Sequence, residues 1–225
     1  SSSVTVNATV YNVMCVTAGD EKTTILIGAH YDSVPAGPGV NDNGSGSSTL
    51  MELVRAFYQV FGTTTPKNRV RFAWWAAEEM GLLGSLHYAK IAHTTGLLQN
   101  CSFAINMDML GSPNGFPQIH SISKSEPSPM FNITDQMAPI MNKFQALLEN
   151  EYKASNIPYE LIAFEANSDY WPFLYYGIPA GGFATGAGEK KTAAEQVIFK
   201  GLQNVAMDPC YHQNCDRVSS INLDL

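Results

Sequence analysis

The chain has 225 residues, about one and a half times a typical 150-residue domain, so a single compact domain is expected. Hydrophobic residues make up 45% of the chain and charged residues only 15%, which excludes an intrinsically disordered protein. The 20 acidic and 13 basic side chains give a formal net charge of -7, the wrong sign for binding a phosphate backbone, so nucleic acid is not an expected partner. The longest apolar run, near residues 72–77, is too short to span a bilayer, and no membrane-spanning helix is predicted.

Apolar, β-branched runs separated by helical patterns predict the order of elements along the chain. The predicted strands cover residues 4–16, 24–30, 69–77, 102–108 and 159–164. Apolar residues recur every three or four positions over 50–61 and 133–148, which predicts amphipathic helices there. This alternation predicts an α/β three-layer sandwich, with a mostly parallel mixed sheet, helices on both faces and an antiparallel edge formed by the first strand. The Pro/Gly-rich stretches 34–46 and 178–188 are predicted to be functional loops.

The cysteines and the N-glycosylation sequons bear on the cellular compartment. Cys210 and Cys215 are spaced so that a disulfide can join them, which a reducing cytosol would not favour, whereas Cys15 and Cys101 have no assigned partner. The sequons begin at Asn7, Asn43, Asn100 and Asn132. Both features are consistent with a secreted protein or with one in a vacuole-like lumen.

Side chains of the types that bind metal ions follow several of the predicted strands. Ligands of open α/β sheets bind beyond the carboxyl ends of the strands, so these positions are the first candidates for a site. The candidates after the strands, in the glycine-rich loop and in the cysteine-containing loop are His30, Asp32, Asp42, Glu78, Glu79, Asp108 and His212. Any one of them alone could be a helix cap or a structural residue, but their joint position at strand ends favours a site.

The chemistry of this set indicates a metal centre. Imidazole and carboxylate groups without a thiolate suit zinc or a similar divalent ion in an open site, and one shared carboxylate would give a two-metal site. Glu78 and Glu79 are adjacent and point to different sides, so one can act as a base and the other as a ligand. Surface or structural roles are expected for the remaining histidines, His87, His93 and His120. No serine lies in a G-x-S-x-G context, which argues against a serine hydrolase.

Five sequence blocks resemble, in order, the secreted two-zinc aminopeptidases of the leucyl aminopeptidase and aminopeptidase Y type. The blocks are GAHYDS at 28–33, GPGVNDNGSG at 37–46, AAEEMGLLGS at 76–85, NMDMLG at 106–111 and DPCYHQNCD at 208–216. The resemblance covers nearly the whole chain. It implies a zinc-exopeptidase type of fold and an enzyme that hydrolyses the N-terminal peptide bond of peptides with a free α-amino group, with a preference for apolar residues such as Leu.

The resemblance also implies a ligand set for two zinc ions per chain. One ion would be bound by His30, Asp42 and Asp108. The other would be bound by Asp42, Glu79 and His212, so that Asp42 would bridge the two ions. In such enzymes the peptide bond between the residues matching Asp42 and Asn43 is cis, and the same is expected here.

Catalytic roles follow from the same resemblance. Glu78 would be the general base that takes a proton from the zinc-bound water and passes it to the leaving amine. Tyr211 would donate a hydrogen bond to the tetrahedral oxyanion, although it can equally be a packed aromatic residue of the disulfide loop. Asp32 would orient the imidazole of His30 from outside the ligand set.

Two further expectations concern the substrate amine and the domain. Relatives bind the α-amino group with an acidic residue before a Ser-Asp-Tyr/His motif, here 168–170, and the candidates in this chain are Glu160 and Glu165. Some relatives have Arg before that serine, where this chain has Asn167. Residues 1–225 are expected to form a single zinc-peptidase catalytic domain that lacks terminal helical segments of the full-length enzyme.

Three alternatives remain open at this point. A carboxypeptidase or dipeptidase of the same fold would share the metal blocks, and only a free-amine requirement separates it from an aminopeptidase. A glutaminyl-cyclase-like acyltransferase would bind one zinc ion per chain instead of two. An inactive receptor-like ectodomain would have lost metal ligands, and none of the ligand positions is lost here.

Overall fold

The computed structural model describes residues 7–62, 64–126 and 128–224, and a seven-stranded sheet forms the centre of this part of the chain. In the sheet the strands lie in the order β1-β3-β2-β4-β7-β5-β6. Their bounds are β1 Val13–Val16, β2 Asp20–His30, β3 Asn68–Trp75, β4 Cys101–Met107, β5 Gln118–His120, β6 Glu160–Ile162 and β7 Ala180–Ala184.

The sheet is mixed and mostly parallel, as predicted. β2 runs parallel to both β3 and β4, and β4 runs parallel to β7. The predicted antiparallel edge is confirmed, because β1 pairs antiparallel with β3. β5 is antiparallel to β7 and carries β6 parallel to itself at the other edge.

The first strand is shorter than predicted. Of the predicted range 4–16, residues 4–6 lie outside the described residues, and residues 7–12 form no strand. The register pairs Val13 with Trp74 and places Asn12 opposite Trp75, the last residue of β3, so the residues before Asn12 have no partner in β3. The strand therefore begins only where β3 can pair with it.

The glycine-rich stretch 178–188 was wrongly predicted to be a loop throughout, because residues 180–184 form the inner strand β7. Two glycines weaken the local strand signal of this segment. Tertiary packing requires one of them, since a Cβ on Gly181 would lie 2.4 Å from the ring of Phe144. Contact with helix α3, and not local propensity, thus decides this strand.

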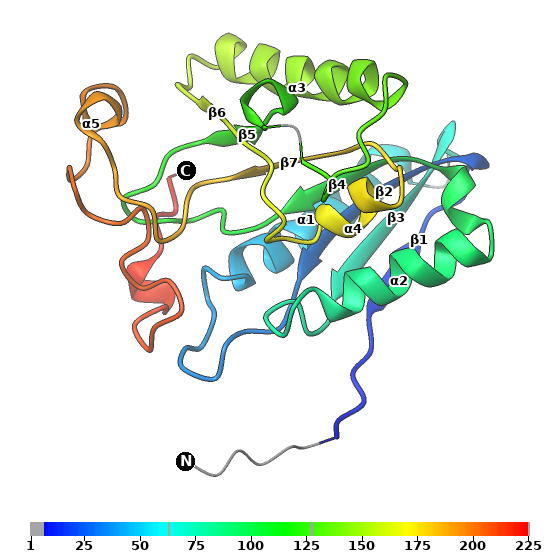
Figure 1. Cartoon of the computed structure of the whole chain (residues 1–225), viewed down its shortest axis with the longest axis horizontal. Helices are drawn as coiled ribbons and strands as arrows, with labels where there is room; N and C mark the ends of the chain where they lie inside the picture. The colour runs from blue at the N-terminus through cyan, green and yellow to red at the C-terminus, as the bar shows by residue number, and fades with distance from the viewer. Residues whose placement is uncertain (1–6, 63, 127, 225) are drawn as a thin grey trace.

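Helices cover both faces of the sheet (Figure 1). Their bounds are α1 Gly44–Phe61, α2 Leu83–Thr94, α3 Met137–Ala154, α4 Trp171–Tyr175 and α5 Ala193–Phe199, with short 3-10 helices η1 Leu97–Asn100, η2 Ile122–Lys124 and η3 Val218–Ser220. α1 packs on one face through a cluster that includes Leu50 and Phe72. α2, α3 and α4 pack on the other face, around Trp75 and Phe173. The predicted three-layer sandwich is confirmed.

Helix boundaries are set by capping contacts. α1 begins six residues before the predicted 50–61 segment, because the Asn43 side chain accepts a hydrogen bond from the N–H of Gly46 at 3.0 Å. α3 replaces the predicted 133–148 helix with a later segment that runs to Ala154. Among the described residues, no helix is both long and apolar enough to cross a membrane.

Candidate metal centre

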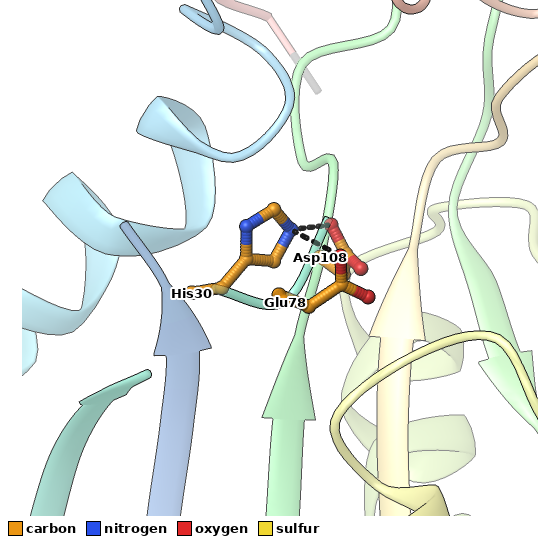
Figure 2. A group of neighbouring side chains, drawn as sticks. All are labelled: His30, Glu78 and Asp108. Atoms are coloured by element: carbon orange, nitrogen blue, oxygen red, sulfur yellow. Dashed lines mark ion pairs between the residues drawn. The ribbon is translucent and has the colours of Figure 1, made fainter. Parts of the chain in front are cut away.

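The topology brings candidate residues from three strand ends to one edge of the sheet. β3, β2 and β4 are neighbours and run parallel, so their carboxyl ends lie side by side. His30 is the last residue of β2, Glu78 and Glu79 follow β3, and Asp108 follows β4. Figure 2 shows the side chains of His30, Glu78 and Asp108 converging above these strand ends. The strands are buried, so the polar residues that follow their carboxyl ends are the ones that form the site.

The first group of possible ligands surrounds His30, which is 1% exposed. His30, Glu78 and Asp108 each offer an atom within 4.8 Å of the others. The Nε2 atom of His30 lies 3.3 Å from Asp108 Oδ1 and 4.0 Å from Glu78 Oε2 (Figure 2). One imidazole nitrogen and two carboxylates therefore face a common point.

The second group combines Asp42, Glu79 and His212, which come from three distant parts of the chain. The Nε2 atom of His212 lies 3.0 Å from Asp42 Oδ2 and 3.0 Å from Glu79 Oε2. The other oxygen of Asp42, Oδ1, lies 3.3 Å from Nε2 of His30. Asp42 thus stands between the two groups, with one oxygen directed at each histidine.

Asp216 ties the C-terminal loop that carries His212 to the loop that carries Asp42. Its two carboxylate oxygens accept the N–H groups of Asn41 at 2.7 Å and of Asp42 at 3.1 Å. Asp216 is 2% exposed, so water competes little for these bonds. Cys210 and Cys215 form the predicted disulfide in this loop, and the peptide bond before Asn43 is cis, as expected. Asp216 closes the last of the five sequence blocks, but no pattern in the sequence predicted its role.

Residues 76–84, here called the Glu loop, comprise the turn after β3 that carries Glu78 and Glu79, together with the first two residues of α2. Asp32 holds the middle of this loop, because its Oδ1 accepts the N–H of Glu78 at 3.0 Å and its Oδ2 accepts the N–H of Glu79 at 3.2 Å. The Nδ1 atom of His30 contacts the main-chain oxygen of Asp32 at 3.2 Å, whereas the carboxylate is 3.7 Å away. Asp32 therefore lies beside His30, but its carboxylate mainly binds the Glu loop.

Ser168 and Asn106 extend the site behind Asp108. The hydroxyl of Ser168 donates to Asp108 Oδ2 at 2.6 Å, and Nδ2 of Asn106 donates to the Ser168 hydroxyl at 2.8 Å. Both side chains are buried. Sequence reasoning assigned them no role, although Ser168 belongs to the motif at 168–170 and Asn106 stands two residues before Asp108.

The electrostatics of the cluster fit bound cations. Burial, together with the nearby carboxylates, raises the pKa of Glu78 to about 9 and that of Glu79 to about 8, because like charges oppose ionisation. The pKa of His30 is raised well above its usual value, since Asp108, Asp32 and Asp42 outweigh the effect of burial. In the described chain, no Lys or Arg lines the cavity around the cluster. Among the described residues that line the cavity, histidines are therefore the only side chains that can carry a positive charge beside these carboxylates.

Buried carboxylate oxygens that lack a hydrogen-bond donor also indicate bound cations. Glu79 Oε1 and Asp108 Oδ1 are buried and have no hydrogen-bond donor among the described residues. A buried carboxylate oxygen without a donor is costly, and coordination of a metal removes that cost. Two imidazoles with carboxylates and no thiolate form a donor set that suits zinc. The residues present therefore fit two divalent ions.

The cluster opens into a cavity of about 670 Å³, which holds the other predicted site residues. Tyr211 lines it and stacks on His212 at 3.9 Å between ring centroids. Burial and then the carboxylate of Asp42 raise the pKa of Tyr211, so its hydroxyl remains a donor at neutral pH. Glu160, at the start of β6, and the exposed Glu165 also line the cavity, but neither belongs to the two ligand groups.

The sequence of residues 12–225 matches the family described as Peptidase family M28. The chain belongs to this family. It is 40% identical over 217 residues to leucine aminopeptidase 2 of Trichophyton rubrum, a match that covers 96% of this chain but only 42% of that relative. The chain therefore spans about two fifths of the length of this curated relative.

Two solved structures place the fold among known proteins. BSAP, a zinc aminopeptidase from Bacillus subtilis, superimposes with a TM-score of 0.68 at 24% identity, over 94% of this chain and 45% of that one. A glutaminyl cyclase from Bacteroides thetaiotaomicron superimposes with a TM-score of 0.64 at 18% identity, over 94% and 71% of the two chains. At these identities, both likenesses concern the fold alone.

Proposed function

We propose that residues 1–225 are the catalytic domain of a zinc-dependent aminopeptidase, a hydrolase that removes the N-terminal residue of peptides. The observation that carries the proposal is the position of the Asp42 carboxylate, which directs one oxygen at His30 and the other at His212, with Glu78 beside His30. The 40% identity to a leucine aminopeptidase over nearly the whole chain supports the same activity. Peptides and protein N-termini are the proposed partners.

The ligand assignment proposed for two zinc ions follows the distances. His30, Asp108 and Oδ1 of Asp42 would bind one ion. Glu79, His212 and Oδ2 of Asp42 would bind the other. When bound, zinc lowers the pKa of a coordinated water and polarises the scissile carbonyl.

The protein's own residues supply the proton transfers. The positive charge of the ions favours the ionised form of Glu78, whose Oε2 would take a proton from the attacking water and deliver it to the leaving amine. The protonated hydroxyl of Tyr211 would donate a hydrogen bond to the oxyanion as it forms. Asp32 would keep Glu78 in place through its bond to the main chain.

Recognition of the free α-amino group is proposed for the acidic wall formed by Glu160 and Glu165. Both carboxylates lie in the wall of the cavity but outside the ligand groups, so they remain available to bind an ammonium group. The aliphatic wall of the same cavity includes Leu82, Met109 and Ile162, which supports a preference for apolar N-terminal residues such as Leu.

Zinc-loaded protein is expected to hydrolyse leucine p-nitroanilide and to leave its N-acetyl counterpart intact. A free ammonium group binds the acidic wall, whereas the acetylated amine carries no charge. Removal of zinc by a chelator should abolish the reaction, and added zinc should restore it. Release of p-nitroaniline from both substrates measures the outcome.

Other outcomes of that experiment point to the competing activities. Cleavage of the acetylated substrate at a similar rate would contradict an aminopeptidase. If neither substrate reacts, one zinc ion per chain would favour the glutaminyl-cyclase alternative. Two ions per chain together with release of C-terminal residues from peptides would favour a carboxypeptidase.

We also infer that the protein passes through an oxidising secretory route to the exterior or to a vacuole-like lumen. The Cys210–Cys215 disulfide supports this inference.

The sequons differ in accessibility. Asn132 is exposed, whereas Asn43 is 1% exposed and uses both amide atoms, accepting from Gly46 and donating to the carbonyl of Met107.

Expression in a eukaryotic secretory host is therefore expected to attach a glycan at Asn132 and none at Asn43. A glycan on Asn43 would have no room, because the side chain is 1% exposed and its Nδ2 faces the carbonyl of Met107. Peptide mass spectrometry after enzymatic deglycosylation in heavy-oxygen water identifies the occupied sites. A glycan found on Asn43 would contradict the described packing of that residue.

A further inference from the structure

Asn12, outside the candidate metal centre, joins the two ends of the Glu loop. It stands directly before β1, where main-chain pairing with β3 stops. Its Oδ1 accepts the N–H of Ala76 at 3.0 Å, and its Nδ2 donates to the carbonyl of Gly84 at 2.9 Å. Ala76 and Gly84 are the first and last residues of the loop, so a single side chain closes it.

The two ends approach so closely that Gly84 has no room for a side chain. A Cβ on Gly84 would lie 2.2 Å from the carbonyl oxygen of Ala76 and 2.4 Å from Oδ1 of Asn12. Asn12 is half-buried, so water replaces its two bonds only in part. An amide offers one donor and one acceptor side by side, which matches the N–H and the carbonyl that it joins.

Asn12 and Asp32 hold different parts of the same loop. Asp32 binds the main chain at Glu78 and Glu79, in the middle of the loop. Asn12 binds the ends, where the chain leaves β3 through Ala77 at a φ of 53°. Release of the ends would let the Glu78 carboxylate move relative to the point that it shares with His30, and a displacement of about 1 Å near reacting groups can cost about 100-fold in rate.

We infer that Asn12 is a positioning residue that holds the Glu loop so that Glu78 stands ready for proton transfer. The inference rests on the proposed aminopeptidase activity and adds a residue from the edge strand to its machinery. It acts on kcat, because Asn12 belongs neither to the ligand groups nor to the residues that line the cavity.

The test compares Asn12→Ala with Thr17→Ala in the full chain. Thr17 stands directly after β1, is also half-buried, and its hydroxyl accepts the N–H of Val70 at 3.0 Å, so it joins the same two strands at their far end. Asn12→Ala is expected to lower kcat about 10- to 100-fold, as other supporting residues of metal sites do, with KM within about twofold. Thr17→Ala should leave both constants unchanged while lowering the melting temperature to a similar extent.

Amide hydrogen exchange and zinc content give readouts that do not depend on turnover. Asn12→Ala should speed exchange over residues 76–84 about 10-fold, and Thr17→Ala should not. Zinc content should stay at the level of the unsubstituted chain, because Asp32 still holds Glu79. If Asn12→Ala does not fold, Asn12→Ser, which keeps one hydrogen-bonding group, takes its place.

The possible results test the role of Asn12 and the proposed aminopeptidase function separately. Equal kcat values for Asn12→Ala and Thr17→Ala, or unchanged exchange over residues 76–84, would overturn the role of Asn12 alone. An inactive unsubstituted chain would overturn the proposed function, and the exchange data would then decide whether Asn12 holds the loop.

Discussion

Glu78→Gln is expected to lower turnover of leucine p-nitroanilide about 1,000-fold, within the range typical of the loss of a general acid–base residue. Glutamine keeps the shape of Glu78 but cannot accept and release a proton in the pH range of the reaction. The N–H that binds Asp32 belongs to the main chain, so the substitution leaves the Glu loop in place. Steady-state kinetics combined with zinc analysis of the same sample separate lost chemistry from lost metal.

A matched control for this substitution is Glu151→Gln, on the exposed surface of α3 and away from the cavity. It should keep normal kcat and KM. Zinc content of Glu78→Gln should equal that of the unsubstituted chain, because neither proposed ligand set contains Glu78. Normal turnover by Glu78→Gln would rule out the proposed mechanism, whatever the zinc content.

Asp42→Asn is expected to leave at most one zinc ion per chain and to lower turnover at least about 100-fold, because both ions act on one reaction centre. The carboxylate of Asp42 directs one oxygen at His30 and the other at His212, and an amide has only one oxygen to offer. Zinc per chain after dialysis, measured by atomic absorption, gives the result directly. The melting temperature should fall as well, since a bound ion stabilises the folded state.

His212→Ala is the comparison for this experiment, because His212 faces only the second group. It should remove one ion and leave the ion beside His30 in place. Retention of two zinc ions by Asp42→Asn would show that Asp42 does not bridge the ions. Equal zinc affinity at both positions in His212→Ala would contradict the assignment of His212 as a ligand.

Much of the fold could be predicted from local patterns in the sequence. Apolar runs predicted β3 and β4 to within two residues and the buried part of β2, because strands buried between two layers are apolar, whereas the polar, exposed start of β2 at residues 20–23 was missed. The edge strand β1 and the inner strand β7 were predicted poorly. β1 is limited by the length of its partner β3, and β7 depends on the ring of Phe144 against Gly181, so neither is encoded in its own residues.

The candidate site, like the fold, could be predicted only in part from the sequence. The sequence alone determined which residues end the strands at one sheet edge, and hence His30, Glu79 and Asp108 as candidate ligands, because parallel neighbours bring their carboxyl ends together. The family resemblance, and not any local pattern, implied that Asp42 is shared between His30 and His212, whereas only the tertiary structure decided that Asp216 fixes its loop and that Asn12 and Asp32 hold the Glu loop. These are contacts between residues tens of positions apart, and hydrogen bonds of that kind depend on distances and angles that no local pattern specifies.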